Sequence, residues 1–284
     1  MKYLHLRFPD GKTKAVTLSY DDGSKHDMRL LETIEKYGLK CTFNLVGSSV
    51  AENERTMNND YIKENIIGKG HEVATHGYFH RAQDLVRPIE GIREVLDSRL
   101  ALEKAFGMII RGMAFPDRGI SRITRPEVYS RIRSYLSELD IAYCRSLGED
   151  HDSFTLPDDF LCWMPTAHHD DPKIFELIER FMSLDVDKQY CASQGPRLFY
   201  LWGHSFEFEN KGNWDHLEKI CAALSGGENV WYATNIEICE YVRAYQSLVY
   251  SADGMTVYNP TLKDLWVSVD KTLWRIGSGE TVRF

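Results

Sequence analysis

Two adjacent carboxylates end an apolar segment near the N-terminus. The sequence "TLSYDDG", residues 17–23, places Asp21 and Asp22 directly before Gly23. Asp-Asp-Gly on its own is typical of a turn that carries solvated charge. The alternative is a site where one carboxylate binds a metal ion and the other accepts a proton. For the pair alone, the turn is the favoured interpretation.

Two histidines follow a second apolar segment. In "EVATHGYFH" they occupy positions 76 and 80. On a helical turn, side chains four residues apart project from the same face, so His76 and His80 could share one metal ion. Together with one aspartate of the first segment they provide three ligands and leave a position open for water, as in a catalytic zinc centre. The second aspartate would then be free to act as a base.

A third histidine follows a third apolar segment. His204 lies in "RLFYLWGHSFEFE", directly after a strongly apolar run. A single histidine in such a position can have a purely structural role. Across a pocket from a metal-bound hydroxide, however, a protonated imidazole would be the natural proton donor to an amine leaving group.

Short apolar runs alternate with amphipathic segments over most of the chain, and this pattern predicts the elements that position these residues. We expect strands at residues 14–20, 41–47, 71–77, 107–115, 142–147, 197–203 and 230–234, and helices at 28–37, 58–68, 88–106, 125–139, 172–183, 213–224 and 235–247. Alternating strands and helices indicate an α/β fold with parallel pairing, and about seven such units favour a barrel. Barrel enzymes carry their chemistry at the carboxyl ends of the strands, where Asp21, Asp22, His76 and His204 are expected.

The C-terminal region has a different pattern. From residue 248 onward, polar and apolar residues alternate around turn signals, and Asp253-Gly254 is typical of a hairpin turn. We therefore predict a barrel domain over residues 1–247 and a small antiparallel β appendage over residues 248–284.

The composition indicates which kinds of binding partner and which cellular location to expect. The formal net charge is -8, which argues against nucleic acid or an anionic membrane as the partner and suits an uncharged or cationic substrate. The N-terminal residues lack the apolar run of a signal peptide, and no run of about 18 apolar residues predicts a membrane span. The six cysteines are scattered and fit reduced thiols, so a cytoplasmic location is expected.

The three segments "TLSYDDG", "THGYFH" and "YLWGHS" together resemble the first, second and fifth motifs of the polysaccharide deacetylases of the NodB-homology type. Their order and separation also match, and the resemblance covers about residues 12–245. It implies a distorted (β/α) barrel, of the (β/α)7 type, and metal-dependent removal of an acetyl group from an N-acetylated sugar. By position, Asp21 would be the catalytic base and His204 the general acid, with Asp22, His76 and His80 as the metal ligands.

A divalent metal is the implied cofactor. Two imidazoles and a carboxylate favour Zn²⁺, and Co²⁺, Ni²⁺ or Fe²⁺ also suit such a ligand set. Pro116 and Asp117 are expected beside the substrate, where a backbone amide of residues 116–118 would hold the oxyanion. Trp163, in "LCWMPT", loosely matches the fourth motif, whose tryptophan would form a wall of the acetyl pocket; a core position is equally consistent with its sequence context.

This sequence differs most from the family at the third motif. It normally contains an arginine that orients the catalytic aspartate, but "GMAFPDRG" has Ala114 or Phe115 at that position. Arg118 and Arg111 are the alternative partners of Asp21 in this part of the sequence, although a surface position is the simpler interpretation of Arg111. This departure puts the substrate in question more than the chemistry.

A second group of candidate ligands lies in "TAHHDDP", residues 166–172. His168, His169, Asp170 and Asp171 could form another metal site. Because consecutive side chains usually point in different directions, we favour a helix start, with Asp171 as N-cap and Pro172 in the first helical position.

Three functions are therefore considered. The first is N-deacetylation of an amino sugar or oligosaccharide, with release of acetate. The second is hydrolysis of another C–N bond, in a cyclic ureide or imide, on the same scaffold. The third is a non-catalytic carbohydrate-binding relative, against which the presence of all five site residues argues. No glycine-rich phosphate loop follows the first strand, so nucleotide binding has little support. The oligomeric state cannot be predicted.

Overall fold

A computed structural model of the protein describes residues 3–50, 54–147 and 153–284. Within those residues, every helix is too short or too polar to span a lipid bilayer. All six cysteines are free, and every one except Cys191 is buried.

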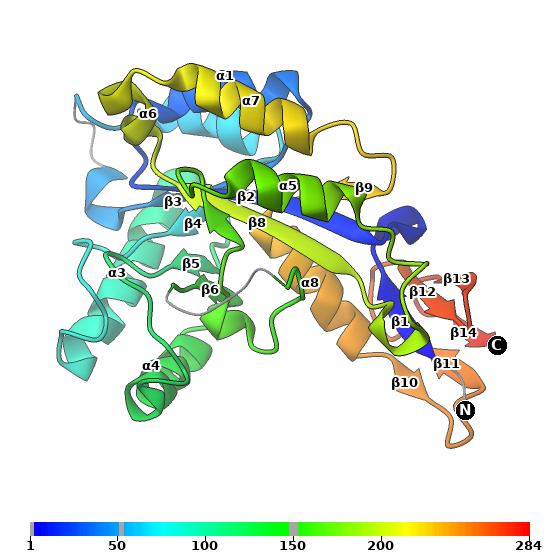
Figure 1. Cartoon of the computed structure of the whole chain (residues 1–284). Helices are drawn as coiled ribbons and strands as arrows, with labels where there is room; N and C mark the ends of the chain where they lie inside the picture. Colours follow the sequence, from blue (N-terminus) through cyan, green and yellow to red (C-terminus); the bar gives the residue numbers. More distant parts are fainter. Residues whose placement is uncertain (1–2, 51–53, 148–152) are drawn as a thin grey trace.

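The centre of the molecule is a curled parallel sheet (Figure 1). Its strands follow the order β6 (Tyr143–Arg145), β5 (Gly112–Ala114), β4 (Glu72–Thr75), β3 (Cys41–Leu45), β2 (Lys14–Asp21), β8 (Arg197–Gly203) and β7 (Ala167–His168), and β9 (Val230–Tyr232) pairs with the first half of β2. A bridge between Arg145 and Trp163 connects β6 to the chain that leads into β7, so the two edges of the sheet approach each other. The distorted barrel expected from the sequence is confirmed.

The helices lie outside the sheet, largely where the sequence predicts them. They are α1 (Asp27–Lys36), α2 (Asn59–Tyr61) with the π-helical turn Ile62–Ile67, α3 (Pro88–Phe106), α4 (Pro126–Glu138), α5 (Ile174–Ser183), α7 (Trp214–Leu224) and α8 (Asn235–Gln246). Strand β1 and several 3-10 turns were not predicted, nor were two short elements beside the site. They are β7 and the helix α6 (Ser205–Lys211), and both border the site described below.

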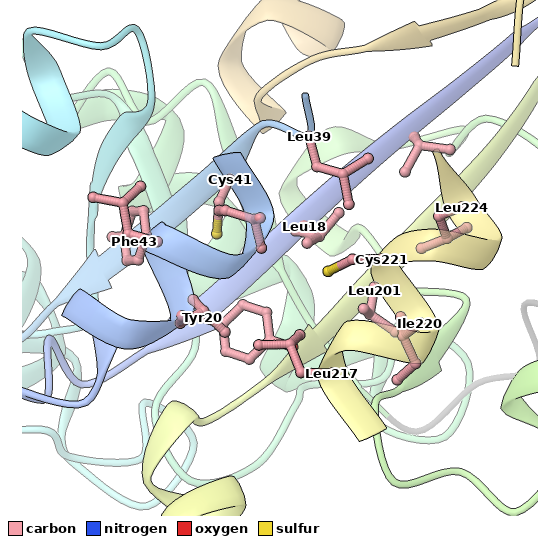
Figure 2. Packing of buried hydrophobic residues seen from close by; sticks show 14 of the residues in the cluster. Leu18, Tyr20, Leu39, Cys41, Phe43, Leu201, Leu217, Ile220, Cys221 and Leu224 are labelled. Atoms are coloured by element: carbon pink, nitrogen blue, oxygen red, sulfur yellow. The ribbon is translucent and has the colours of Figure 1, made fainter. Parts of the chain in front are cut away.

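The sequence of β2 is largely apolar because the strand lies in the core of the protein. All eight of its residues are buried, as expected for a central parallel strand covered by helices on both faces. Figure 2 shows Leu18 of β2 and Leu201 of β8 in one cluster with Leu217 and Leu224 of α7. This packing fixes the carboxyl ends of β2 and β8, and therefore the polar residues that follow them.

The C-terminal strands form two small antiparallel sheets (Figure 1). One contains β10 (Val249–Tyr250), β11 (Thr256–Tyr258) and β14 (Thr281–Arg283), and Gly254 lies in the predicted hairpin turn at φ 69°. In the other, β12 (Leu265–Val269) pairs with both β13 (Thr272–Ile276) and β1 (Leu4–Arg7). Residues 4–7 are thus hydrogen-bonded to the predicted appendage, while the division at residues 247 and 248 remains a prediction.

Candidate metal centre and catalytic site

Three of the predicted ligands converge at the carboxyl edge of the sheet. Asp22 follows β2, and His76 follows β4. Asp22 Oδ1 lies 3.7 Å from His76 Nε2 and 3.4 Å from His80 Nε2. Ligands about 2.0–2.1 Å from a tetrahedral zinc ion are separated by about 3.3–3.4 Å, so these three atoms can hold one divalent cation after small shifts.

The two histidines come together, but not on the helical turn that the sequence predicted. Residues 76–80 do not form a helical turn; the chain is irregular, with Gly77 at φ 76° and His80 at φ 58°. Asp22 at φ 76° and Asp117 at φ 58° share this left-handed conformation, which is unfavourable for residues with a side chain. Such strain typically gathers at functional sites.

His76 is prepared as a ligand by its second ring nitrogen. Its Nδ1–H donates a hydrogen bond of 2.9 Å to the carbonyl oxygen of Ala114 at the end of β5. This bond fixes the tautomer and directs the Nε2 lone pair at Asp22 and His80. Burial lowers the pKa of His76, despite the nearby carboxylates of Asp21 and Asp22, and so favours the neutral ring that a metal requires.

Asp21 is buried and held as an anion. Its Oδ1 accepts a hydrogen bond of 2.8 Å from Asn44 Nδ2, and its Oδ2 pairs with the guanidinium of Arg145. Burial would raise the pKa of Asp21, but the positive charge of Arg145, together with His76 and His204, outweighs it and lowers that pKa. An ionised carboxylate beside the cluster of ligands can accept a proton from a water molecule there.

Arg145 is the residue that sequence reasoning missed. It ends β6 and is fully buried, with its guanidinium 4.4 Å from the ring centroid of Trp202. The suggested alternatives do not reach Asp21, because Arg118 pairs with Asp84 at 3.1 Å and Arg111 with Asp140 at 2.9 Å. A charged residue inside the apolar run "AYCRSL" was the signal available in the sequence.

His204 faces Asp21 from the next strand, β8. Its Nε2 lies 3.9 Å from Asp21 Oδ2, and its Nδ1 lies 3.5 Å from Glu207 Oε1. Burial would lower the pKa of His204, but the carboxylates of Glu207, Asp21 and Asp22 outweigh it and raise that pKa. The ring therefore favours the protonated form, which can donate a proton.

The predicted substrate-binding residues lie in two places. Asp117 is beside the metal ligands, with Oδ1 3.5 Å from His80 Nδ1, and a side chain on Gly77 would meet Pro116 at 3.2 Å. Trp163 is 1% exposed and packs against the rings of Tyr143 and Tyr200, although it also lines a cavity of about 240 Å³. Its role at an acetyl pocket remains a prediction.

The "TAHHDDP" segment differs in detail from its prediction. Helix α5 begins at Ile174 with Lys173 as N-cap, so Asp171 is not the N-cap; instead Asp171 Oδ1 accepts a hydrogen bond of 2.8 Å from the Lys173 amide. The other three candidate ligands, His168, His169 and Asp170, lie close to one another and to Glu207 of α6.

A family model described as polysaccharide deacetylase matches residues 9–131 of the chain. This span contains the Asp-Asp pair, both histidine ligands and the altered third motif. No curated protein sequence matches the chain significantly.

Solved structures support the same fold. A presumed polysaccharide deacetylase from Mycobacterium smegmatis is 19% identical, with a TM-score of 0.56 over 85% of this chain and 94% of its own. The Xyl-CE4 domain of a multidomain xylanase from the hindgut metagenome of Trinervitermes trinervoides is 17% identical, with a TM-score of 0.52 over 82% of this chain and 92% of its own. A CE4 family pseudoenzyme from Bacillus anthracis, as a mutant with restored enzymatic activity, is 17% identical, with a TM-score of 0.51 over 83% of this chain and 70% of its own.

The motif order, the curled parallel sheet and the matching family model agree with one another. The chain is therefore similar to the polysaccharide deacetylase family over residues 9–131 and shares the fold of the solved structures.

Proposed function

We propose that this protein is a metal-dependent deacetylase that hydrolyses the N-acetyl amide of an amino sugar or oligosaccharide and releases acetate. The observation that supports this most is the arrangement around Asp21. This carboxylate lies between a cluster of three ligands and the imidazole of His204, whose pKa the neighbouring carboxylates raise. A base, an acid and a metal-binding cluster on one strand edge are the groups that amide hydrolysis needs.

The ligand set fits a catalytic zinc ion. Asp22, His76 and His80 would hold it, and a bound divalent cation polarises an amide carbonyl and makes water more acidic. Two imidazoles and one carboxylate also leave room for a further ligand, as hydrolysis requires.

The reaction assigned to the protein side chains has two proton transfers. Asp21 accepts a proton from the water whose oxygen attacks the acetyl carbon, and Arg145 keeps Asp21 ionised for this step. His204 donates a proton to the amide nitrogen as the C–N bond breaks, which gives acetate and a free amine.

The loop after β5 supplies a candidate for binding the oxyanion. The Arg118 amide already donates to the Pro116 carbonyl at 2.7 Å, and Pro116 has no N–H group. The amide of Asp117 is therefore the candidate donor in this segment, and its residue also approaches His80.

The altered third motif was the reason to consider cyclic ureides or imides as substrates. Arg145 now supplies the guanidinium beside Asp21 that this motif lacks. N-deacetylation of an amino sugar therefore needs no change of mechanism. Hydrolysis of a cyclic ureide and carbohydrate binding without catalysis are the alternative outcomes of the experiment below.

The experiment combines elemental analysis with a substrate panel. Purified protein loaded with Zn²⁺ is incubated with N-acetylglucosamine, its oligomers and a cyclic ureide, and acetate, ammonia and ring-opened product are measured. We expect acetate from at least one N-acetylated sugar. Product from the ureide alone would replace the proposal, and tight binding of an oligosaccharide without any product would identify a non-catalytic relative.

A further inference from the structure

A second group of convergent ligands lies beside the first. It consists of His168 and His169 at the end of β7, Asp170 directly after them, and Glu207 in α6; we call it the second cluster. His169 Nε2 lies 3.0 Å from Glu207 Oε2 and 3.3 Å from Asp170 Oδ2. These separations are close to the edges of about 3.3–3.4 Å expected between the ligands of a tetrahedral zinc ion.

The His169 ring is buried and lacks hydrogen bonds. It is 0% exposed, and within the described part of the chain neither ring nitrogen has a hydrogen-bond partner, nor does Glu207 Oε2. An unsatisfied buried polar group typically costs about 1–3 kcal/mol. A cation between Nε2 and the two carboxylates would satisfy the ring and Glu207 together.

The surroundings hold this ring in place. It stacks between Phe208 and Tyr20, at centroid distances of 4.1 and 5.8 Å. At Gly203 the backbone passes so close that a Cβ atom would lie 2.0 Å from His169 Nδ1. The ring therefore cannot turn away, and Nε2 stays directed at the carboxylates.

His168 has a different role from His169. Its Nδ1 accepts a hydrogen bond of 3.1 Å from the Asp170 amide, so the neutral ring carries its proton on Nε2, 3.1 Å from Glu207 Oε2. A nitrogen that carries a proton does not coordinate a metal. The Nε2 atom of His168 therefore offers no lone pair to a metal ion, which leaves His169, Asp170 and Glu207 as ligands.

The charge of the second cluster also suits a cation. Asp170 pairs with the ammonium group of Lys211, whose side chain is 50% exposed and free to move into solvent. Two carboxylates and one ammonium leave a net negative charge at the cluster. Because the Lys211 ammonium contacts the same Asp170 oxygen that would bind the ion, it would compete with a bound ion.

We propose that His169 Nε2, Asp170 Oδ2 and Glu207 Oε2 form a second divalent-cation site, suited to Zn²⁺. The site connects to the first through Glu207, because its other oxygen, Oε1, lies 3.5 Å from His204 Nδ1. A bound ion would fix this carboxylate and so the His204 ring. Only this last consequence rests on the proposed function; the site itself does not.

The test is the zinc stoichiometry of the full-length protein. Metal-free protein is titrated with Zn²⁺, desalted and analysed by elemental mass spectrometry against protein concentration. We expect two equivalents for the wild type, one for His169→Ala, one for His76→Ala and none for the double variant. His26→Ala, which changes a histidine of neither cluster, should keep two. One equivalent in the wild type that only His76→Ala removes would overturn the proposal.

Two milder variants guard against misfolding of His169→Ala. Glu207→Gln keeps the size of the side chain, and its far-ultraviolet circular dichroism should match the wild type while it binds one equivalent. Lys211→Met removes the competing ammonium, so the dissociation constant of the second equivalent should fall by about tenfold. Two equivalents in a folded Glu207→Gln, or an unchanged dissociation constant in Lys211→Met, would contradict the ligand assignment. These outcomes do not depend on whether acetate is released from any sugar.

Discussion

The guanidinium of Arg145 at the end of β6 pairs with the carboxylate of Asp21 at the end of β2, and both side chains are only 2% exposed. Three strands, β5, β4 and β3, separate β6 from β2 in the sheet. The pair therefore forms only because the sheet curls and brings its strand ends together. It places a guanidinium beside Asp21, where the third motif of this chain provides none.

Replacing Arg145 with methionine should impair catalysis and stability together. The buried Asp21 carboxylate would lose its counter-charge, which typically costs about 3–5 kcal/mol. Its pKa would rise, so the acidic limb of the pH–rate profile should move to higher pH, and kcat should fall by about 100-fold or more. Acetate release measured across pH, with urea unfolding of the same samples, checks this result.

Arg145→Lys is the matched control, because it keeps the positive charge but loses the planar guanidinium. Its acidic limb should stay closer to that of the wild type. If the methionine variant kept the pH profile and kcat of the wild type, Arg145 would have only a packing role on Trp202.

Asp21→Asn and His76→Ala should separate metal binding from proton transfer. The asparagine cannot accept the proton, so turnover should fall by about 10²–10⁴-fold while the first zinc equivalent remains. His76→Ala should lose both that equivalent and the activity, because one of three ligands is removed. Zinc content and acetate release are measured on the same preparations; full activity of Asp21→Asn would disprove its role as the base.

The activity lost in His204→Ala should depend on the leaving group of the substrate. An amine must be protonated as it departs, whereas 4-nitrophenolate leaves readily without a proton. The variant should therefore lose about 100-fold in kcat on an N-acetylated sugar and much less on 4-nitrophenyl acetate. Equal losses on the amide and on the ester would assign His204 to substrate binding instead of acid catalysis.

Glu72 should make stability depend on pH. Burial raises its pKa to about 7 from the ordinary 4.5, although its oxygens accept hydrogen bonds of 2.7 Å from Tyr143 and Thr42. Between these two pKa values the folded protein keeps the proton and the unfolded chain releases it. The contribution of Glu72 is therefore fully present below about pH 4.5 and is lost as pH rises to about 7. The pKa difference corresponds to a loss on the order of 3 kcal/mol.

The measurement is urea unfolding of the wild type and Glu72→Gln from pH 5 to pH 7.5. The amide has no such titration, so the wild-type free energy of unfolding should fall relative to that of the variant as pH rises. Parallel curves would show that Glu72 has an ordinary pKa. The difference between the two proteins isolates Glu72 from the other groups that titrate in this range.

The sequence by itself determined the main part of the site. Alternation of strands and helices implies parallel pairing, and parallel strands place their carboxyl ends at one edge. Asp21 ends such a strand, and Asp22, His76 and His204 each follow one, so their convergence could be inferred before any coordinates. Local signals were sufficient because each of these residues lies at or next to the end of its own strand.

Only the tertiary structure decided which distant groups complete the site. The choice of Arg145 over Arg118 depends on the curl of the sheet, which no local pattern encodes. The direction of the His169 ring depends on close packing against Gly203 and Phe208. These relationships arise between segments far apart in the chain, where a change in strand order or packing would select other partners; a sequence pattern records each segment but not which segments meet.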